Sequence, residues 1–160
     1  MNKKGFFIIC TSFITAVVMA AVIFAFSGIY PGSEKILFVF DMLEQFAAFY
    51  SSLKGLFSGG VSFLYTFQGS LGTSYMGTYA YYLASPFSFI TCLFDAEHLP
   101  DAIWLMDMVK AGVIGAAFSA FAFFRGVRKP FINVVLSMCY ALSSATVYIF
   151  PLTVILEKSA

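Results

Sequence analysis

Charged residues are scarce in this sequence. Asp, Glu, Lys and Arg make up 11% of its 160 residues, and hydrophobic residues make up 61%. Soluble domains carry about 25% charged residues, and a domain this apolar could not cover its surface with polar side chains. The composition therefore predicts a membrane protein. The basic residues form no face or stripe, so no nucleic-acid partner is expected.

Cysteine and the usual site motifs are also scarce. The three cysteines, Cys10, Cys92 and Cys139, are odd in number and widely spaced. They give no disulfide framework and no paired-cysteine metal motif, so we expect each to be a buried apolar residue. The sequence has no glycine-rich phosphate loop, no zinc-ligand spacing and no nucleophile elbow. His98 is the only histidine, and no metal ligands are predicted.

What the chain has instead is long apolar runs. Residues 5–28 carry no charge, and about 20 apolar residues suffice to cross a bilayer. This run exceeds the roughly 7–15 apolar residues of a signal peptide, so it predicts a retained helix. We expect an all-α polytopic membrane protein, a single membrane domain over residues 1–160. About three transmembrane helices are predicted, at residues 5–29, 102–124 and 131–150.

Between the first two predicted spans lies a long segment, residues 30–100. Residues 41–57 have apolar side chains at helical spacing, which predicts an amphipathic helix in the membrane interface. Gly59 and Gly60 follow it. Residues 61–78 are interrupted by glycines and are predicted to be loop. Residues 79–94 are apolar but interrupted at Ser85-Pro86, so we expect a broken segment that is seated in the membrane without crossing it.

The distribution of charge predicts the orientation. Cytoplasmic loops carry an excess of Lys and Arg. With three spans, five basic residues lie on the cytoplasmic side without any acidic residue: Lys3, Lys4, Arg125, Arg128 and Lys129. A crossing by residues 79–94 would place the last three outside. The charges therefore favour a multi-pass topology with a cytoplasmic N-terminus and residues 30–100 outside the cell.

Three acidic or basic residues are candidates for chemistry. Asp41 begins the predicted amphipathic helix, where it is either a helix cap or a general base or ligand at the membrane surface. Asp107 and Lys110 are three residues apart within the second span, so they share a helix face. Ionisable groups inside a membrane are costly and suggest function. They form a mutual ion pair, or Lys110 binds the phosphate of a lipid carrier.

Other polar and small residues read as packing or interface features. The predicted third span has a polar face that is typical of contacts between helices, as is the small-residue face of the second span. These faces are Asn133, Ser137, Tyr140 and Ser144, and Gly112, Ala116 and Ala120. We expect other transmembrane helices as partners for them. The tyrosines of the long segment form an interfacial belt or a platform for a sugar ring: Tyr65, Tyr75, Tyr79, Tyr81 and Tyr82.

Several short motifs occur in an order that resembles the YfhO family of bacterial membrane proteins. The resemblance extends from about Gly5 to Ser144, and Tyr81-Tyr82-Leu83-Ala84-Ser85-Pro86-Phe87 is its most specific part. The other matching pieces are Tyr30-Pro31-Gly32, the apolar run into Asp41, Gln45, Gly59-Gly60, Tyr65-Thr66-Phe67, Gly69-Ser70-Leu71-Gly72, Lys110-Ala111-Gly112 and Tyr140-Ala141-Leu142-Ser143.

The resemblance implies a GT-C type glycosyltransferase. Such an enzyme transfers a sugar from a polyprenyl-phosphate-linked donor to a cell-envelope polymer, such as lipoteichoic acid, on the outer face of the membrane. It implies that Asp41 is the catalytic base. Lys110, or a divalent cation as cofactor, would neutralise the leaving phosphate. The candidate substrate-binding residues are Lys110, Gln45, Gly69, Gly72, Tyr81 and Tyr82.

The chain is short for this family, whose members have a dozen or so spans. We therefore expect the N-terminal portion of a larger GT-C fold, which holds the first outer loop and lacks the rest of the donor and acceptor sites. Two alternatives stay open at this point. One is a non-catalytic small membrane protein or subunit that acts through association of its helices. The other is part of a transporter, which would require residues 79–94 to cross the membrane as a broken helix.

Overall fold

The computed structural model describes residues 3–33, 47–57, 59, 62–67 and 72–157, without the side chains of residues 47, 81, 82, 96 and 144–157. Within these ranges the chain is helical, and the one strand-like feature is an isolated bridge between Thr66 and Thr73. The predicted all-α class is confirmed. The chain divides into two compact units. We call residues 1–35 and 107–160 the helical unit, and residues 36–106 the loop unit.

Three long helices correspond to the predicted spans. They are α1 (Lys3–Phe26), α4 (Leu99–Phe124) and α5 (Pro130–Glu157). Among the described residues, α1 and α4 are long and apolar enough to cross a membrane. With 28 residues α5 is also long enough, but its described side chains end at Ser143. Its role as a third span therefore remains a prediction.

Two glycines end these helices. After α1, Gly28 has φ 77°, and the backbone N–H groups of Gly28 and Ile29 donate to the carbonyls of Ala25 and Phe24. Gly126, with φ 102°, repeats this arrangement after α4. Such left-handed caps satisfy carbonyls that would otherwise lack a partner, and glycine adopts them without steric cost. The predicted end of the first helix at residue 29 was wrong, because the glycine cap ends it at Phe26.

Two prolines lie at or inside helices. Pro130 occupies the first position of α5, where the missing N–H would have no intrahelical partner. The third span was predicted to end at residue 150, but α5 continues through Pro151 to Glu157. A proline removes one backbone hydrogen bond, and membrane helices tolerate this loss. At the other boundary α4 begins at Leu99 and so includes Pro100 in its first turn, three residues before its predicted start.

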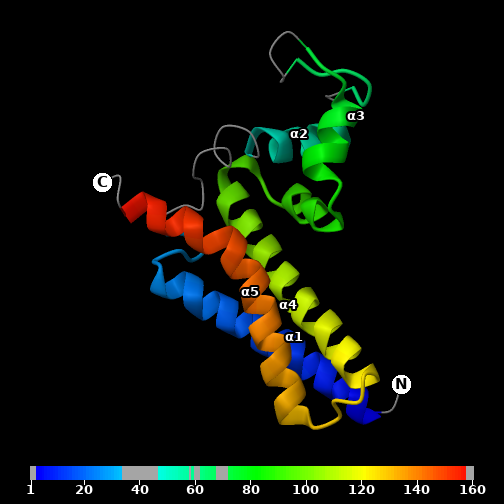
Figure 1. Ribbon diagram of the computed structural model, residues 1–160. Helices are drawn as coiled ribbons and strands as arrows, with labels where there is room; N and C mark the ends of the chain where they lie inside the picture. The colour runs from blue at the N-terminus through cyan, green and yellow to red at the C-terminus, as the bar shows by residue number, and fades with distance from the viewer. Residues whose placement is uncertain (1–2, 34–46, 58, 60–61, 68–71, 158–160) are drawn as a thin grey trace. The chain divides into compact units, whose positions relative to one another are not determined.

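Small residues allow the helices of the helical unit to approach closely (Figure 1). A Cβ atom on Gly112 of α4 would lie 2.6 Å from the Phe13 ring of α1. A Cβ on Gly115 would lie 2.9 Å from Cβ of Ala16. The predicted face of Gly112, Ala116 and Ala120 is therefore only partly right: Gly115 is buried, whereas Ala116 and Ala120 are half-buried. Helix α1 also packs along α5.

We expect Gly112→Leu to destabilise the helical unit by about 1–3 kcal/mol, because overpacking a close contact forces neighbouring side chains and backbone apart. Gly115→Leu should act in the same direction. Unfolding in mixed detergent and SDS micelles, followed by circular dichroism, measures the change. Gly77→Leu is the control, since nothing lies within 4 Å of a Cβ built there. Equal stability of all three variants would contradict the close packing.

A buried amide joins α5 to α4. Asn133 and Ser119 are both completely buried. The Asn133 side-chain oxygen accepts a hydrogen bond from the Ser119 hydroxyl (2.7 Å), and its nitrogen donates to the carbonyls of Val127 (2.9 Å) and Ser119 (3.2 Å). The Ser137 hydroxyl donates to the Asn133 carbonyl. The predicted packing role of Asn133 and Ser137 is confirmed, and it is fulfilled within the chain.

Tyr140 and the cysteines fit the predictions less well. Tyr140 is 47% exposed and stacks on Phe118 of α4, with ring centroids 4.4 Å apart. The Ser144 side chain lies outside the described residues. The three cysteines were predicted to be buried, but Cys10 and Cys92 are half-buried and Cys139 is exposed. In a membrane an exposed apolar residue faces lipid tails, which are as apolar as a protein core, so burial is not required.

The loop unit contains only short helices. They are α2 (Ala47–Phe57), α3 (Tyr75–Thr78), a π-helical turn (Tyr79–Leu83) and two 3₁₀ helices (Pro86–Leu93 and Ala96–His98). Even α2, with 11 residues, is shorter than the roughly 20 needed to cross a bilayer. The interruption predicted at Ser85-Pro86 is present: Ser85 is extended and its hydroxyl accepts from the Phe87 N–H. Residues 75–78 were predicted to be loop and are helical.

Candidate functional site

The loop unit has its own hydrophobic core. Tyr50 and Leu53 of α2 are buried against Leu83 and the first turns of α4, with Phe87 and Ile90 of the 3₁₀ helix packed alongside. The apolar face predicted for α2 is confirmed for Phe49, Leu53 and Leu56, the described members of the pattern. This face is buried against protein. The unit can therefore hold a rigid surface, which a binding site on loops requires.

One tyrosine of the predicted belt belongs to this core. Tyr75 is completely buried, and its hydroxyl lies 3.2 Å from the Ser52 hydroxyl. A buried tyrosine needs such a partner for its O–H group. The prediction that Tyr75 forms part of an interfacial belt or a sugar platform was wrong. Tyr79 is half-buried and packs against the same core, whereas Tyr65 is 46% exposed.

The motif with Gly72 closes a short loop. Two hydrogen bonds of 2.9 Å pair Thr66 with Thr73 through their backbones. Gly72 has φ 104°, and a Cβ atom there would overlap the Tyr65 hydroxyl. Both the backbone conformation and the space therefore require glycine. Tyr65 also contacts Phe67 edge to face, with ring centroids 5.0 Å apart. The predicted substrate-binding residue Gly72 thus positions an exposed pair of aromatic rings.

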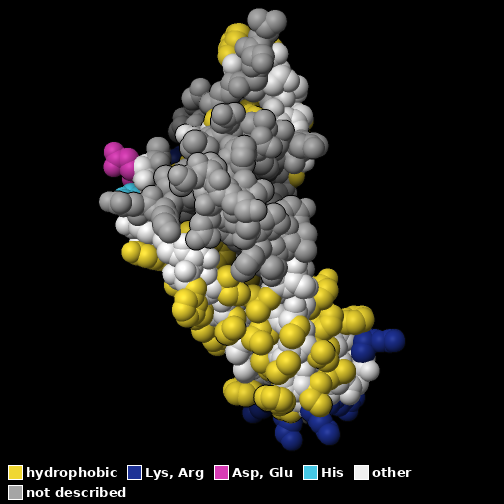
Figure 2. All heavy atoms as spheres, turned by 60° about the vertical axis from the view of Figure 1, so that its left-hand side comes forward, with side chains coloured by type: hydrophobic (Ala, Val, Ile, Leu, Met, Phe, Trp, Pro, Cys, Tyr) yellow, Lys and Arg dark blue, Asp and Glu magenta, His cyan; other side chains and the backbone are white. Residues whose placement is uncertain are grey.

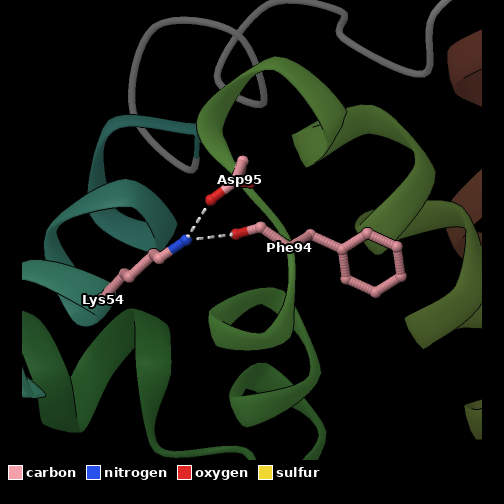
Figure 3. A network of polar contacts seen from close by, with 3 residues as sticks. All are labelled: Lys54, Phe94 and Asp95. Atoms are coloured by element: carbon pink, nitrogen blue, oxygen red, sulfur yellow. Dashed lines mark hydrogen bonds and ion pairs between the residues drawn. The ribbon is translucent and has the colours of Figure 1, made fainter.

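Lys54 ties α2 to the segment that precedes α4. Its Nζ donates to the Asp95 carboxylate at 2.7 Å and to the Phe94 carbonyl at 2.9 Å (Figure 3). The hydrogen bond and the charge of Lys54 lower the pKa of Asp95 below its ordinary value of 3.8. The sequence gave no sign of this pairing, because the two residues are 41 positions apart. The contact joins α2 to the residues that follow the 3₁₀ helix Pro86–Leu93.

The Lys54–Asp95 contact should depend on pH. Because the pKa of Asp95 is lowered in the folded state, the contact stabilises fully above the ordinary pKa and is lost as pH falls through the lower, folded value. NMR titration of the Asp95 carboxyl carbon should give a midpoint below 3.8, which Lys54→Met raises and Lys54→Arg preserves. The Asp95 side chain is 85% exposed, so global stability should change little. A midpoint unaffected by Lys54→Met would contradict the pairing.

Asp107 and Lys110 form the predicted pair on α4. Lys110 Nζ lies 3.4 Å from the Asp107 carboxylate, and their side chains are 32% and 17% exposed. Of the two predicted alternatives, the structure therefore shows the mutual ion pair. The Lys110 ammonium lies on an apolar helix, and part of the side chain remains accessible. Losing Lys110 to a phosphate would leave the Asp107 carboxylate unpaired in apolar surroundings, which is costly, so an anion bound at Lys110 would have to add to the pair and not replace Asp107.

The sequence similarity agrees with these features. Residues 12–154 match the sequence model of a family described as bacterial membrane protein YfhO. The chain belongs to the YfhO family. No curated protein and no solved structure shows significant similarity to it. Membership of this bacterial membrane protein family, together with the apolar helices α1 and α4, supports association with the membrane.

Several predicted site residues of this YfhO-family chain are not among the residues that the structure describes. Asp41, Gln45 and Gly69 lie outside the described residues. The backbones of Tyr81 and Tyr82 belong to the π-helical turn, and their side chains are not described. Within the described ranges the structure places Gly72 in the loop unit and Lys110 in the helical unit. The role of Asp41 as catalytic base and the substrate-binding roles of the other six residues remain predictions.

Two residues missed by sequence reasoning have buried polar atoms. Within the described ranges, the Ser88 hydroxyl and the Trp104 indole nitrogen have no hydrogen-bond partner. A buried polar group without a partner costs free energy, so both are candidates to contact a bound polar molecule. No spacing or motif marks either one. No group of three potential metal-ligand side chains (His, Cys, Asp or Glu) occurs in the part of the chain that the structure describes.

Proposed function

We propose that this YfhO-family chain carries the first outer loop of a GT-C type glycosyltransferase. The enzyme would transfer a sugar from a polyprenyl-phosphate-linked donor to a cell-envelope polymer, such as lipoteichoic acid. The observation that carries the proposal is the Lys110 ammonium, held by Asp107 on an apolar helix. Ionisable residues within membrane helices mark substrate or ion sites, and a lipid-linked phosphate is an anion that reaches this depth.

The orientation follows from the same reasoning. We place the N-terminus in the cytoplasm and the loop unit outside the cell, with α1, α4 and α5 crossing the membrane. The basic residues at the start of α1 and between α4 and α5 support this arrangement, because Lys and Arg favour the cytoplasmic side. The short helices of the loop unit support a segment that does not cross. A transporter, in which residues 79–94 would cross the membrane as a broken helix, is disfavoured by the same distribution of Lys and Arg.

The proposed reaction is a single displacement. The acceptor hydroxyl oxygen attacks the anomeric carbon of the sugar, and the bond from that carbon to the phosphate oxygen breaks. The Asp41 carboxylate takes the proton of the attacking hydroxyl as general base. Polyprenyl phosphate leaves with a negative charge that Lys110 neutralises. Gln45 and the segment from Gly69 to Tyr82 would shape the sugar site. A divalent cation would supply the same neutralisation as Lys110.

The direct test is sugar transfer by the full chain in proteoliposomes, with a radiolabelled polyprenyl-phosphate sugar and lipoteichoic acid as acceptor. We expect Lys110→Met to lower the rate by about tenfold or more, since loss of one group that stabilises developing charge costs up to about 10²–10³. Lys110→Arg keeps the charge and should retain most of the rate. No transfer by the unmodified chain would reject the proposed activity for this chain, and a rate unaffected by Lys110→Met would reject the role of Lys110.

A non-catalytic protein that acts through helix association is the second candidate. The faces first expected to bind partner helices are filled within the chain, at Gly112 and Asn133. What favours association is a different surface on α5, where apolar side chains remain exposed: Phe131, Ile132, Val135, Leu136 and Tyr140. Lipid tails or another helix can cover this surface. Cysteine cross-linking at Leu136 in native membranes should yield a defined adduct if this candidate is right.

A further inference from the structure

One end of the helical unit gathers five basic residues. A Cβ atom on Gly5 would lie 2.9 Å from the tip of the Phe123 ring, so the start of α1 lies beside the end of α4. Lys3 and Lys4 precede this contact, and the turn that joins α4 to α5 follows it, with Arg125, Arg128 and Lys129. All five cations are exposed. Figure 2 shows dark blue Lys and Arg side chains gathered at this end.

The turn that carries three of these cations has a fixed backbone. Gly126 adopts φ 102°, and the N–H of Arg128 donates to the Gly126 carbonyl at 2.9 Å. The buried amide of Asn133 donates to the Val127 carbonyl. The Arg128 guanidinium lies 6.0 Å from the centre of the Phe123 ring, within reach of a cation–π interaction. The backbone of the turn is therefore held in place, which reduces the entropy lost when an anion binds.

No acidic side chain neutralises this end among the described residues. The ion pairs that the described residues form involve Lys54, His98 and Lys110, and none of them includes one of the five cations. Asp107 is the nearest described acidic residue along α4, and 17 residues separate it from Phe124. That separation is about 25 Å along an α-helix, more than twice the Debye length of about 10 Å at 0.1 M salt. The positive charge of the five residues is thus uncompensated within the described chain.

Exposed phenylalanines border the cations on the same end. Five phenylalanines close to the basic residues in the sequence are between 59% and 80% exposed: Phe6, Phe7, Phe121, Phe124 and Phe131. Figure 2 shows yellow hydrophobic side chains next to the dark blue ones. A nucleic-acid partner in water would leave most of these rings exposed. A bilayer covers the rings and offers phosphates at the level of the cations.

We propose that the five cations bind the headgroups of anionic phospholipids at the cytoplasmic surface. The ligand is a negatively charged phosphodiester lipid, held by the turn 125–129 and the start of α1. Each Lys or Arg near an anionic membrane surface contributes roughly a fivefold gain in binding. This inference needs no sugar transfer and stands or falls independently of the proposed enzyme activity.

The test measures which lipid occupies this end of the protein. A Trp104→Phe, Phe124→Trp variant places the single tryptophan beside the cations. Trp104→Phe removes no hydrogen bond formed with the described residues, because the Trp104 indole nitrogen makes none there. The variant is reconstituted in bilayers that contain brominated phosphatidylglycerol or brominated phosphatidylcholine, which quench tryptophan on contact. We expect phosphatidylglycerol to bind about fivefold more tightly than phosphatidylcholine at low salt.

Three further measurements decide the outcome. Arg125→Gln, Arg128→Gln and Lys129→Gln together should bring the ratio of the two lipids close to one, while the natural Trp104 reporter shows no change. High salt should also bring this ratio close to one for the Phe124→Trp reporter that keeps all five cations. That measurement tests the proposal even if the triple variant fails to fold. Inorganic phosphate at 10 mM should not displace the lipid if the headgroup is the ligand. A ratio near one with all cations present, a ratio that persists in the triple variant, or displacement by phosphate would overturn the proposal.

Discussion

Asp41→Asn should lower the rate of sugar transfer by roughly 10²–10⁴-fold, the largest effect that we expect from any single substitution in this chain. Asparagine has nearly the same shape as aspartate but cannot accept a proton from the acceptor hydroxyl. Binding of the polyprenyl-phosphate donor should change little, because the carboxylate acts on the acceptor. The measurement is the initial rate of transfer in proteoliposomes, together with donor binding in the absence of acceptor.

A neighbouring carboxylate provides the matched control. Glu44 follows Asp41 by three residues in the same segment, so Glu44→Gln removes the same charge close by and should keep most of the rate. If Glu44→Gln abolishes transfer and Asp41→Asn does not, the base has been assigned to the wrong residue. If both variants lose donor binding, the segment binds the donor and does not supply the base.

The long helices could be predicted from the sequence because their signal is local. An uncharged apolar run of sufficient length must satisfy its own backbone in a bilayer, and only a helix does so for a single segment. Residues 3–26 and 99–124 therefore became helices close to the predicted bounds. The interruption at Ser85-Pro86 was local as well, because proline disfavours the helical conformation of the residue before it.

The packing of these helices could not be predicted to the same degree. In a uniformly apolar helix every face is compatible with lipid, so hydrophobicity does not indicate which side contacts protein. The close contact on α4 involves Gly115, whereas spacing suggested Ala116. Tyr75 was assigned to the membrane interface and is in a core, since a partner such as Ser52 from another segment cannot be seen from local pattern.

The candidate site was the least predictable part. The Lys54–Asp95 contact joins residues 41 positions apart, and neither belongs to a motif. The Asp107–Lys110 pair was predictable, because three residues on a helix bring two side chains to the same face. Asp41 was assigned a function through family resemblance alone, since an aspartate at a helix start is equally well explained as a cap.

Asn133→Leu should destabilise the helical unit by about 2–4 kcal/mol. The substitution removes a completely buried amide and leaves the Ser119 hydroxyl and the Val127 carbonyl without their partner. A buried polar group left unpaired costs about 1–3 kcal/mol. Unfolding in mixed detergent and SDS micelles, followed by circular dichroism, measures the loss. Ser143→Ala is the control, because that hydroxyl is exposed and bonds only its own helix.

A double variant separates the lost hydrogen bonds from the change of shape. In Ser119→Ala, Asn133→Leu both side-chain partners are gone, so no hydroxyl remains unpaired at that contact. We expect the double variant to be more stable than the sum of the two single losses predicts, by about 0.5–3 kcal/mol. Strict additivity would mean that the two side chains do not interact. The same substitution frees the Val127 carbonyl, so the turn with Arg125, Arg128 and Lys129 should lose its fixed geometry and with it part of its lipid preference.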